Sequence, residues 1–412
     1  MNFQYFIAKR IATQKDYKSS ISAPIIKIAI LAISLGMITM LISVATSVGL
    51  QKKIKEKVSA FNGDLIITNF DTNNSDDSQV PISTSQDFYP NFTISDNVSH
   101  IQITASKAAV LRTETDFEGI ILKGVGPDYN WSYFKDFLTQ GVVPSYQTPQ
   151  MSNQVLISQY LANRLGLKVG DKALTYFFNK NSNTPTRTRA FTISGIYDSG
   201  FQQFDAQFII GDIRHIQRLN KWEPDQIGAF ELFVKDFDSI EQTNMQVYDS
   251  IGSSLDTQTI ADRFYTIFEW LDLFDFNVVL IIVMMIIVAG FNMITALLVL
   301  ILERTKMIGI LKALGSDTWS VRKIFIYNAM YLVGVGLFWG NIIGLGLLLL
   351  QQQFDLFALD PKTYYVSQVP VYIHWSYIMA LNIGTLVLCF LILLIPSYII
   401  SKISPVKAIR FE

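Results

Sequence analysis

Four long apolar blocks interrupt the chain, and polar stretches of very different lengths separate them. The blocks cover residues 24–50, 273–302, 324–350 and 375–400. Each is longer than the roughly 20 residues that a helix needs to cross the hydrocarbon core of a bilayer, and residues 278–302 and 325–350 carry no charge. Four such blocks favour transmembrane helices over buried helices of a soluble protein. The first block is also longer than the apolar part of a signal peptide, so we expect it to remain in the mature chain.

The short loops predict the orientation of these helices. The loop 303–323 carries five Lys and Arg residues, whereas the loop 351–374 carries Lys362 alone. Positively charged loops stay in the cytoplasm, so we expect 303–323 inside and 351–374 outside. Four helices then place both ends of the chain, residues 1–23 and 401–412, in the cytoplasm. Long domains cross with little regard for charge, so we accept the opposing lysines after the first block: Lys52, Lys53, Lys55 and Lys57.

Residues 51–272 then form one large extracytoplasmic domain. From Val58 to Glu269 the chain carries 15 Lys and Arg against 25 Asp and Glu, a net charge of −10. Apolar runs of mixed period predict an α+β fold. We expect helices over 158–165, with Ser158 as N-cap and Gly166 at its end, and over 212–220. We expect strands over 64–68, 100–111, 119–125, 154–157, 173–178, 189–197 and 207–210.

Both joins between this domain and the membrane have helical periodicity. After the first block, apolar residues recur at i, i+4 and i+7: Ile54, Val58 and Phe61. Before the second block, the pattern runs through Ile260, Phe264, Ile267, Phe268 and Leu271. We expect the first and second spans to continue as helical stalks that carry movement to the outer domain, rather than only to cap its base.

Composition and the absence of known motifs argue against catalysis by this chain. Only 16% of the residues are charged, and the net charge of −1 gives no field for nucleic acid. Cys389 is the only cysteine and the three histidines are spread along the chain, which excludes an intramolecular disulfide and disfavours a histidine-rich metal site. Walker A, G-x-S-x-G and H-E-x-x-H motifs are absent. We expect no catalytic residue, metal or cofactor in this chain, and a partner protein as the energy source.

The apolar blocks contain few polar residues and one regular set of glycines. We expect Asn292 and Asn341 to form hydrogen bonds between helices rather than to bind a transported ion. Gly336, Gly340 and Gly344 recur every four residues and so share one helical face. Small residues let helix backbones approach closely, so this face is expected to pack on a helix of the same chain or of a second copy.

The loop between the second and third blocks has the pattern of a short amphipathic helix. Its apolar stripe consists of Met307, Ile308, Leu311 and Leu314. Gly315 suits the position after the helix, and Asp317 suits the N-cap of the next helix. We expect this stripe to be uncovered by the membrane and to dock another protein.

The same loop carries a resemblance to a known family. Residues 303–316 (ERTKMIGILKALGS) and the ending 404–412 (SPVKAIRFE) resemble the FtsX-like permeases of ABC transporters. Within that family, the chain is most similar to the lipoprotein-releasing (LolC/LolE-type) permeases, on FIAKR at 6–10, LGLKVGD at 165–171 and FNMI at 291–294. Tyr364-Tyr365-Val366 and Val369-Pro370-Val371 agree with this subgroup. The resemblance implies four transmembrane helices in the bacterial inner membrane, with a MacB-like periplasmic core domain between the first two.

The resemblance also implies a mechanism in which ATP, Mg²⁺ and hydrolysis belong to a cytoplasmic ABC ATPase dimer. ATP binding would close the spans, and the stalks would move the periplasmic domain. The residues implied in ATPase coupling are Glu303, Arg304, Met307, Ile308, Gly309, Leu311, Lys312, Leu314 and Gly315. A second permease copy or a paralogue would complete the membrane part.

A lipoprotein is the implied cargo, entering sideways from the membrane lipid between the first two spans and leaving for a periplasmic lipoprotein chaperone. We expect lipid-facing Met40, Leu41 and Val44, with Phe276 and Val279, to contact its acyl chains. The loop 179–188 lies where one subgroup member has a chaperone-recruiting hook, so Thr184, Pro185 and Arg187 are candidate hook residues.

Two other functions of the family remain open at this stage. One is export of a peptide or drug, as in the macrolide exporters. The other is regulation of a cell-wall hydrolase without transport, as in the cell-division branch. Neighbouring genes for a lipoprotein chaperone, a membrane-fusion protein or a peptidoglycan hydrolase would separate the three functions.

Overall fold

The computed structural model describes residues 4, 6–7, 22–72, 79–178 and 187–404. The chain divides into two compact units. The helical unit comprises Met1–Gln51, Trp270–Ala358 and Gln368–Glu412, and the sheet unit comprises Lys52–Glu269 and Leu359–Ser367. Each unit has its own buried apolar core.

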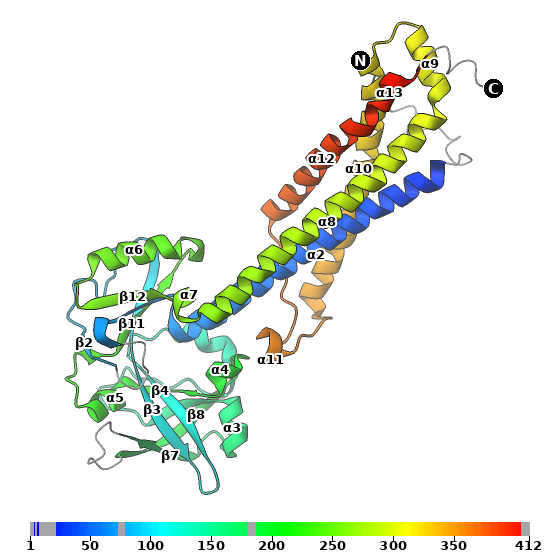
Figure 1. The fold of residues 1–412 in the computed structure, drawn as a ribbon. Helices are drawn as coiled ribbons and strands as arrows, with labels where there is room; N and C mark the ends of the chain where they lie inside the picture. Colours follow the sequence, from blue (N-terminus) through cyan, green and yellow to red (C-terminus); the bar gives the residue numbers. More distant parts are fainter. Residues whose placement is uncertain (1–3, 5, 8–21, 73–78, 179–186, 405–412) are drawn as a thin grey trace. The chain divides into compact units, whose positions relative to one another are not determined.

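Four helices are long and apolar enough to cross a membrane, as predicted (Figure 1). They are α2 (Ser22–Asn62), α8 (Tyr265–Glu303), α10 (Thr318–Phe354) and α12 (Trp375–Ser397). Two short helices accompany them: α9 (Thr305–Ala313) joins α8 to α10, and α13 (Ile399–Lys402) follows α12.

Helices α2 and α8 extend well beyond the apolar blocks. Helix α2 has 41 residues and runs without a break to Asn62. The expected helix before the second block is interrupted at Phe264 (φ −112°, ψ 42°), which separates α7 (Ile260–Arg263) from α8. A capping box between Thr259 and Asp262 begins α7, because each side chain satisfies a backbone amide of the other.

Helices α2 and α10 pack closely along the three predicted glycines, and we call this contact the glycine seam. A Cβ at Gly336 would lie 2.8 Å from the Cβ of Ile33, one at Gly340 would lie 2.7 Å from that of Met37, and one at Gly344 would lie 3.0 Å from Leu41 Cδ1. The residue numbers of the contacting residues increase in the same direction along both helices, so α2 and α10 run parallel. Ser34 Oγ also donates to the Gly336 carbonyl at 2.9 Å. Of the two predicted partners, the structure shows a helix of the same chain.

Adding one methyl group at the glycine seam is expected to force α2 and α10 apart. Gly340→Ala places a Cβ against Met37 and the Ser34 carbonyl, and overpacking of this kind costs about 1–3 kcal/mol. Gly334→Ala is the matched control, because nothing lies within 4 Å of its Cβ. We expect Gly340→Ala, and not Gly334→Ala, to lower the thermal midpoint of the detergent-solubilised protein. Equal midpoints for both variants would contradict the packing described above.

Polar contacts between the long helices are few. The amides of Asn341 in α10 and Asn382 in α12 bond each other reciprocally at 2.8 and 3.0 Å, which confirms the interhelical bond predicted for Asn341. Asn292 instead donates to the Val288 carbonyl of its own helix. The bond predicted between helices is therefore found for Asn341, whereas the bond of Asn292 lies within α8.

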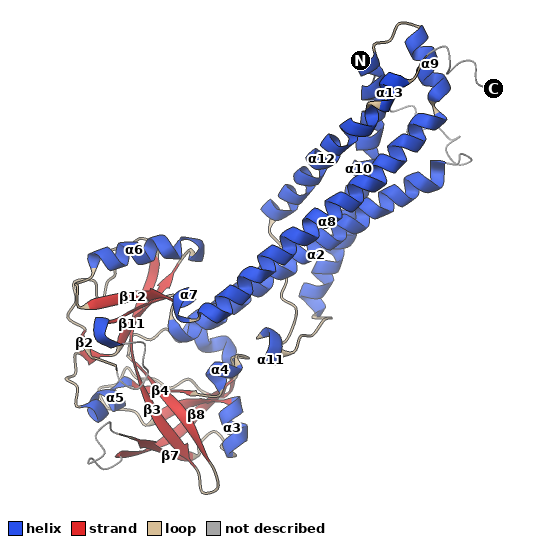
Figure 2. Ribbon diagram, viewed as in Figure 1, coloured by secondary structure: helices blue, strands red, loops and turns tan. Residues whose placement is uncertain are grey.

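The sheet unit is an α+β domain, as predicted (Figure 2). Among the described residues, ten strands form one sheet in the order β12-β1-β11-β3-β4-β9-β6-β8-β5, with β7 pairing β3 and β8. The strands are β1 (Leu65–Asn69), β3 (Val98–Arg112), β4 (Phe117–Val125), β5 (Leu138–Gly141), β6 (Gln154–Ser158), β7 (Lys172–Phe177), β8 (Arg187–Tyr197), β9 (Phe208–Asp212), β11 (Ala229–Val234) and β12 (Leu255–Thr259). A separate pair joins β2 (Ile82–Ser83) to β10 (Gln226–Ile227).

Six of these strands pair in a closed ring. Strand β3 pairs β4, β4 pairs β9, β9 pairs β6, β6 pairs β8, β8 pairs β7, and β7 returns to β3. This ring is possible because β3 is 15 residues long and bonds β11 along its first part and β7 along its last. Gly124 in β4 lets helix α5 approach, since a Cβ there would lie 2.7 Å from Ile213 Cα.

Short helices surround the sheet. They are α3 (Gln159–Leu165), α4 (Gln202–Asp205), α5 (Ile213–Asn220), α6 (Ile240–Ser250), α7 and α11 (Pro361–Tyr364), with 3-10 turns at Phe70–Thr72, Trp131–Phe137 and Phe237–Ser239. The predicted caps of α3 are confirmed: Ser158 accepts from the Leu161 amide, and Gly166 ends the helix at φ +66°. Asp212 caps α5 in the same way. Strands β5, β11 and β12 and helix α6 were not among the elements predicted from sequence.

A buried ion pair lies where α2 ends in the sheet unit. Lys123 Nζ in β4 is 2.6 Å from Glu231 Oε1 in β11, and both side chains are about 5% exposed (5% and 6%). Lys123 also donates to the carbonyl of Phe61 in the last turn of α2. The other carboxylate oxygen of Glu231 accepts from the Gln102 amide at 2.9 Å. The end of the long helix is therefore held by a charged network inside the domain.

Candidate functional site

The α9 corner is the first candidate site, and its backbone is tightly defined. Gly315 adopts φ +88° after the helix. Its amide donates to the Lys312 carbonyl, and the Ser316 amide donates to the Leu311 carbonyl. This is the Schellman arrangement that stops a helix at glycine. Asp317 then caps α10 by accepting from the Trp319 amide, so both sequence predictions at this corner are confirmed.

The predicted apolar stripe of α9 is largely covered. Ile308 is fully buried, and Met307 and Leu311 pack against the core of the helical unit. Gly309 is also buried. The expectation that this stripe is free to dock a partner is therefore wrong for three of its four residues, because the ends of the long helices offer an apolar surface that the stripe covers. Leu314, at 79% exposed, is the fourth.

A different face of α9 is exposed. Ile310 is 51% exposed, and Lys306 and Ala313 are exposed beside it. Lys306, Ile310, Ala313 and Leu314 are spaced as one helical face. Glu303 and Leu302 at the end of α8 are also exposed, and Arg304 is half-buried. This face, Lys306/Ile310/Ala313/Leu314, is the surface of the α9 corner that a partner protein can reach.

Two cations tie the corner to the end of α12. Lys312 Nζ donates to the carbonyls of Ile400 (2.6 Å) and Ile403 (2.9 Å), where the C-terminal end of α13 favours positive charge. Burial lowers the pKa of Lys312. Arg322 donates to Ser397 Oγ and to the Leu394 carbonyl. Lys312 therefore anchors α9 within the chain, which is a role distinct from the contact with a partner implied for it by the family resemblance.

In the structure, some residues of the candidate cargo entrance are exposed and others are buried. Phe276 and Val279 on α8 are 66% and 58% exposed. Met40, Leu41 and Val44 are only 2%, 3% and 8% exposed. The expectation that these three face lipid is wrong, because all three are buried in the helical unit, where Leu41 packs on Gly344 of α10. Leu41 and Val44 line a small recess with Leu345, Leu348 and Tyr372.

The candidate hook is only partly described. Thr184 and Pro185 lie outside the described residues. Arg187, at the start of β8, donates to the carbonyls of Arg218 (3.2 Å) and Leu219 (3.1 Å) at the end of α5. This side chain therefore braces the base of the β7–β8 hairpin against α5.

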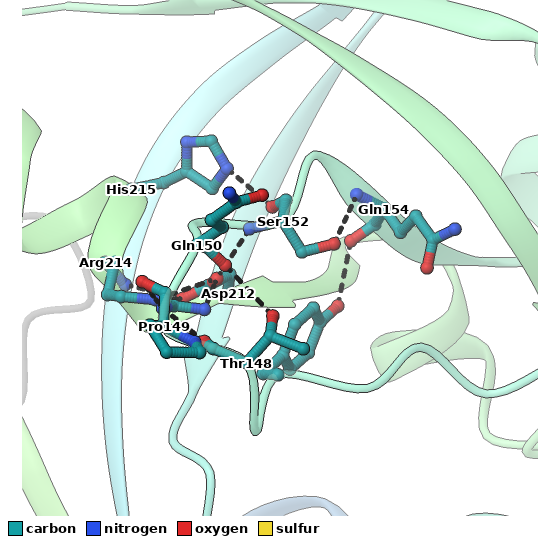
Figure 3. Close-up of polar contacts among 9 residues, drawn as sticks. Thr148, Pro149, Gln150, Ser152, Gln154, Asp212, Arg214 and His215 are labelled. Carbon is teal, nitrogen blue, oxygen red and sulfur yellow. Dashed lines mark hydrogen bonds and ion pairs between the residues drawn. The ribbon is translucent and has the colours of Figure 1, made fainter.

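A serine, a histidine and an aspartate meet in the sheet unit, as Figure 3 shows. His215 Nε2 lies 2.8 Å from the carbonyl of Ser152, not from its hydroxyl. The Asp212 carboxylate accepts from the Ser152 amide and from the guanidinium of Arg214. Nucleophilic catalysis needs the base to face the hydroxyl and the acid to face the base, so these residues are not arranged as a triad.

The same residues instead hold a loop in place. Arg214 Nη1 donates to the carbonyls of Thr148 (2.8 Å) and Pro149 (2.9 Å), as drawn in Figure 3. Burial lowers the pKa of His215, which favours its neutral form. The network fastens residues 148–152 to the start of α5. Nor do the described residues contain a group of His, Cys, Asp and Glu side chains suited to a metal ion.

Two family models match the chain. The model of the MacB-like periplasmic core domain matches residues 28–249, and that of the FtsX-like permease C-terminal region matches residues 279–405. The first covers α2 and most of the sheet unit, and the second covers most of α8 and all of α9, α10 and α12. The first match therefore spans parts of both units, and the second lies in the helical unit apart from Leu359–Ser367.

Individual relatives agree with these models. The chain is 26% identical over 271 residues to the lipoprotein-releasing system transmembrane protein LolC of Haemophilus influenzae, a match that spans 64% of this chain and 66% of that protein. It is 20% identical over 426 residues to LolE of the same organism, over 99% of both chains. Among solved structures, the extracellular domain of the transporter YknZ matches with a TM-score of 0.33 and 13% identity, covering 48% of this chain and 100% of that domain.

The family follows from the extent of these matches and from the structure. Four apolar helices, a short helix between the second and third, and an α+β unit between the first and second agree with both models. The MacB-like match alone spans more than half of the 412 residues. The chain belongs to the FtsX-like permeases of ABC transporters that carry a MacB-like periplasmic core domain.

Proposed function

We propose that this chain is a permease subunit of a lipoprotein-releasing transporter in a bacterial inner membrane. The observation that carries the proposal is its similarity to LolC and LolE, two proteins named for lipoprotein release, with the LolE match extending along the whole chain. In this reading it extracts acylated proteins from the membrane and delivers them to a periplasmic chaperone.

The chemistry of the spans supports an acylated cargo. Helix α8 carries no charged residue between Asp275 and Glu303, and α10 carries none between Lys323 and Asp355. An ion or a charged drug needs polar groups along its path, whereas an acyl chain needs apolar surface. Each buried CH₂ contributes about 0.8 kcal/mol to membrane attachment, so removing several chains from lipid requires an external source of energy.

A separate ATPase dimer on the cytoplasmic side supplies that energy in this proposal. It docks on the exposed face Lys306/Ile310/Ala313/Leu314 of α9, with both ends of the chain in the cytoplasm and the sheet unit outside. A second permease, either another copy or a paralogue, completes the complex. Movement of α2 and α8 then reaches the sheet unit, because both helices are covalently continuous with it.

Photo-crosslinking in cells tests the cargo directly. A benzoylphenylalanine at Phe276, exposed near the start of α8, is expected to capture an acylated protein, and less of it when the complex is trapped with ATP. The same probe at Phe338, which is 60% exposed on α10, is the matched control and is expected to capture phospholipid.

Depletion of the chain provides the second arm of this test. We expect outer-membrane lipoproteins to accumulate in the inner membrane when the protein is depleted. Normal lipoprotein sorting, together with only phospholipid crosslinks at Phe276, would rule out lipoprotein release and favour export of another substrate.

A further inference from the structure

A short segment from the loop between α10 and α12 belongs to the sheet unit. Residues Leu359–Ser367 group with Lys52–Glu269. The segment folds back on itself: the Leu359 amide donates to the Ser367 carbonyl at 3.0 Å, and α11 lies between them. Asp360 begins that turn, because its carbonyl accepts from the amides of Thr363 and Tyr364. Tyr365 follows α11 at the tip of this loop.

Tyr365 contacts Phe201 and Lys57 in the rest of the sheet unit. Its ring stacks on that of Phe201 with 4.1 Å between centroids and 12° between planes. Its backbone carbonyl accepts from Nζ of Lys57, on α2, at 3.0 Å. Phe201 is fully buried, so the stacking fixes the tyrosine on a rigid support.

The backbone on both sides of this contact is unusual. Tyr365 has φ +59°, a conformation that costs free energy for an aromatic residue. Gly200 faces it with φ +68°, and a Cβ at Gly200 would lie 2.8 Å from Lys57 Nζ. A side chain at position 200 would therefore require the flexible end of Lys57 to shift. A tyrosine held at positive φ while its ring stacks on a buried phenylalanine indicates a contact that the surrounding structure enforces.

The charges around Lys57 favour the same geometry. Burial lowers the pKa of Lys57, and the neighbouring Asp198 and Asp205 carboxylates oppose that effect. Burial has the larger effect on the pKa of Lys57, and the lowering is limited by the two carboxylates. They belong to the same segment as Phe201, so one short stretch of the sheet unit presents both the stacking ring and the compensating charge.

An aromatic series connects Tyr365 to the ends of both long helices. Phe201 stacks on Phe204 at 5.0 Å. Phe204 in turn contacts Phe61, at the end of α2, at 5.0 Å, and Phe264, just before α8, at 5.4 Å. Rings in such contact exclude water and pack rigidly. A displacement of the Tyr365 loop therefore acts on the same cluster that receives α2 and α8.

We propose that Tyr365 and Lys57 form a latch that couples the α10–α12 loop to the sheet unit, with Tyr365 as a positioning residue for energy transfer. The latch gives the sheet unit a third attachment to the membrane helices, besides the chain connections through α2 and α8. It rests on the proposed function only in assuming that nucleotide binding by a partner ATPase moves the helices.

The test uses the complete complex with its ATPase and compares three variants. Tyr365→Ala removes the ring, Tyr365→Phe keeps it, and Tyr364→Ala is the control at the neighbouring exposed tyrosine. All three variants retain the backbone carbonyl of residue 365, so Tyr365→Ala tests the ring alone. Hydrogen exchange at residues 199–204 is measured without nucleotide and with trapped ATP. We expect a nucleotide-dependent change in wild type, in Tyr365→Phe and in Tyr364→Ala, and its loss in Tyr365→Ala, while exchange in β3 and β4 stays unchanged.

Transport is measured on the same samples. Tyr365→Ala is expected to release about ten-fold less lipoprotein per ATP hydrolysed, with ATP hydrolysis retained, and Lys57→Met is expected to behave similarly. A Tyr365→Ala complex with wild-type exchange changes and wild-type release would overturn the latch. So would a wild-type complex in which nucleotide leaves residues 199–204 unaffected. A preserved exchange response with no lipoprotein release from wild type would instead overturn the proposed cargo and leave the latch supported.

Discussion

Replacing Lys123 by methionine is expected to lower the free energy of unfolding of the sheet unit by about 3–5 kcal/mol. The change leaves the Glu231 carboxylate, which is 6% exposed, as a buried charge without its cation. It also removes the donor to the Phe61 carbonyl at the end of α2. The loss is measured as faster hydrogen exchange of the β4 and β11 amides in the full-length protein.

The double variant Lys123→Met with Glu231→Leu shows whether the loss comes from an uncompensated charge. Replacing both partners of a buried pair by apolar residues is often neutral or stabilising, so we expect the second substitution to recover most of the protection. Arg164→Met is the matched control, because its ion pair with Glu118 lies at the surface and is expected to contribute little. A Lys123→Met protein as well protected as Arg164→Met would contradict the buried network.

Ile310→Asp is expected to separate the chain from its ATPase. Ile310 lies at the centre of the exposed face of α9, and a partner that covers it desolvates the new carboxylate. Burying an unpaired charge costs several kcal/mol, and 2 kcal/mol at an interface already weakens binding about 30-fold. We expect the variant to insert in the membrane normally and to lose the ATPase in a pull-down.

Two companion variants make that result specific. Phe117→Asp places the same charge on an exposed aromatic residue of the sheet unit (73% exposed), and it is expected to retain the ATPase. Leu311→Asp, the natural choice from sequence, is expected to damage the protein itself, because Leu311 packs on the core of the helical unit. Retention of the ATPase by Ile310→Asp would exclude this face of α9 as its docking surface.

The sequence was informative where a rule depends on local residues. Long charge-free blocks predicted the four helices, and Ser158, Gly166, Gly315 and Asp317 predicted the helix ends, because caps depend on the residues at the turn itself. The spacing of the seam glycines predicted a close helix contact. It left open which helix they meet, since no local property of α10 specifies α2.

The sequence was misleading where tertiary contacts decide which side chains are buried and which segments pair as strands. In an apolar membrane helix, lipid-facing and buried residues have the same chemistry, so periodicity did not reveal that Met40, Leu41 and Val44 are buried. The α9 stripe was recognised as apolar, but its partner is the bundle of the same chain. Strand β12 reads Leu-Asp-Thr-Gln-Thr, a polar stretch that pairs only because β1 lies beside it.

The glycine seam has a repeat of four residues on both helices, and a repeat implies more than one possible register. Sliding α10 by four residues along α2, about 6 Å, brings Gly340 opposite Ile33 and Gly344 opposite Met37, so two of the three large-on-small pairs form again. Apolar packing alone therefore distinguishes the registers weakly. The Ser34 hydroxyl, which donates to the Gly336 carbonyl, would meet the Gly340 carbonyl after the slide, so this bond distinguishes the registers no better. The reciprocal amide pair Asn341–Asn382 is lost when α10 moves relative to α12, so this one pair between α10 and α12 fixes the axial position of α10.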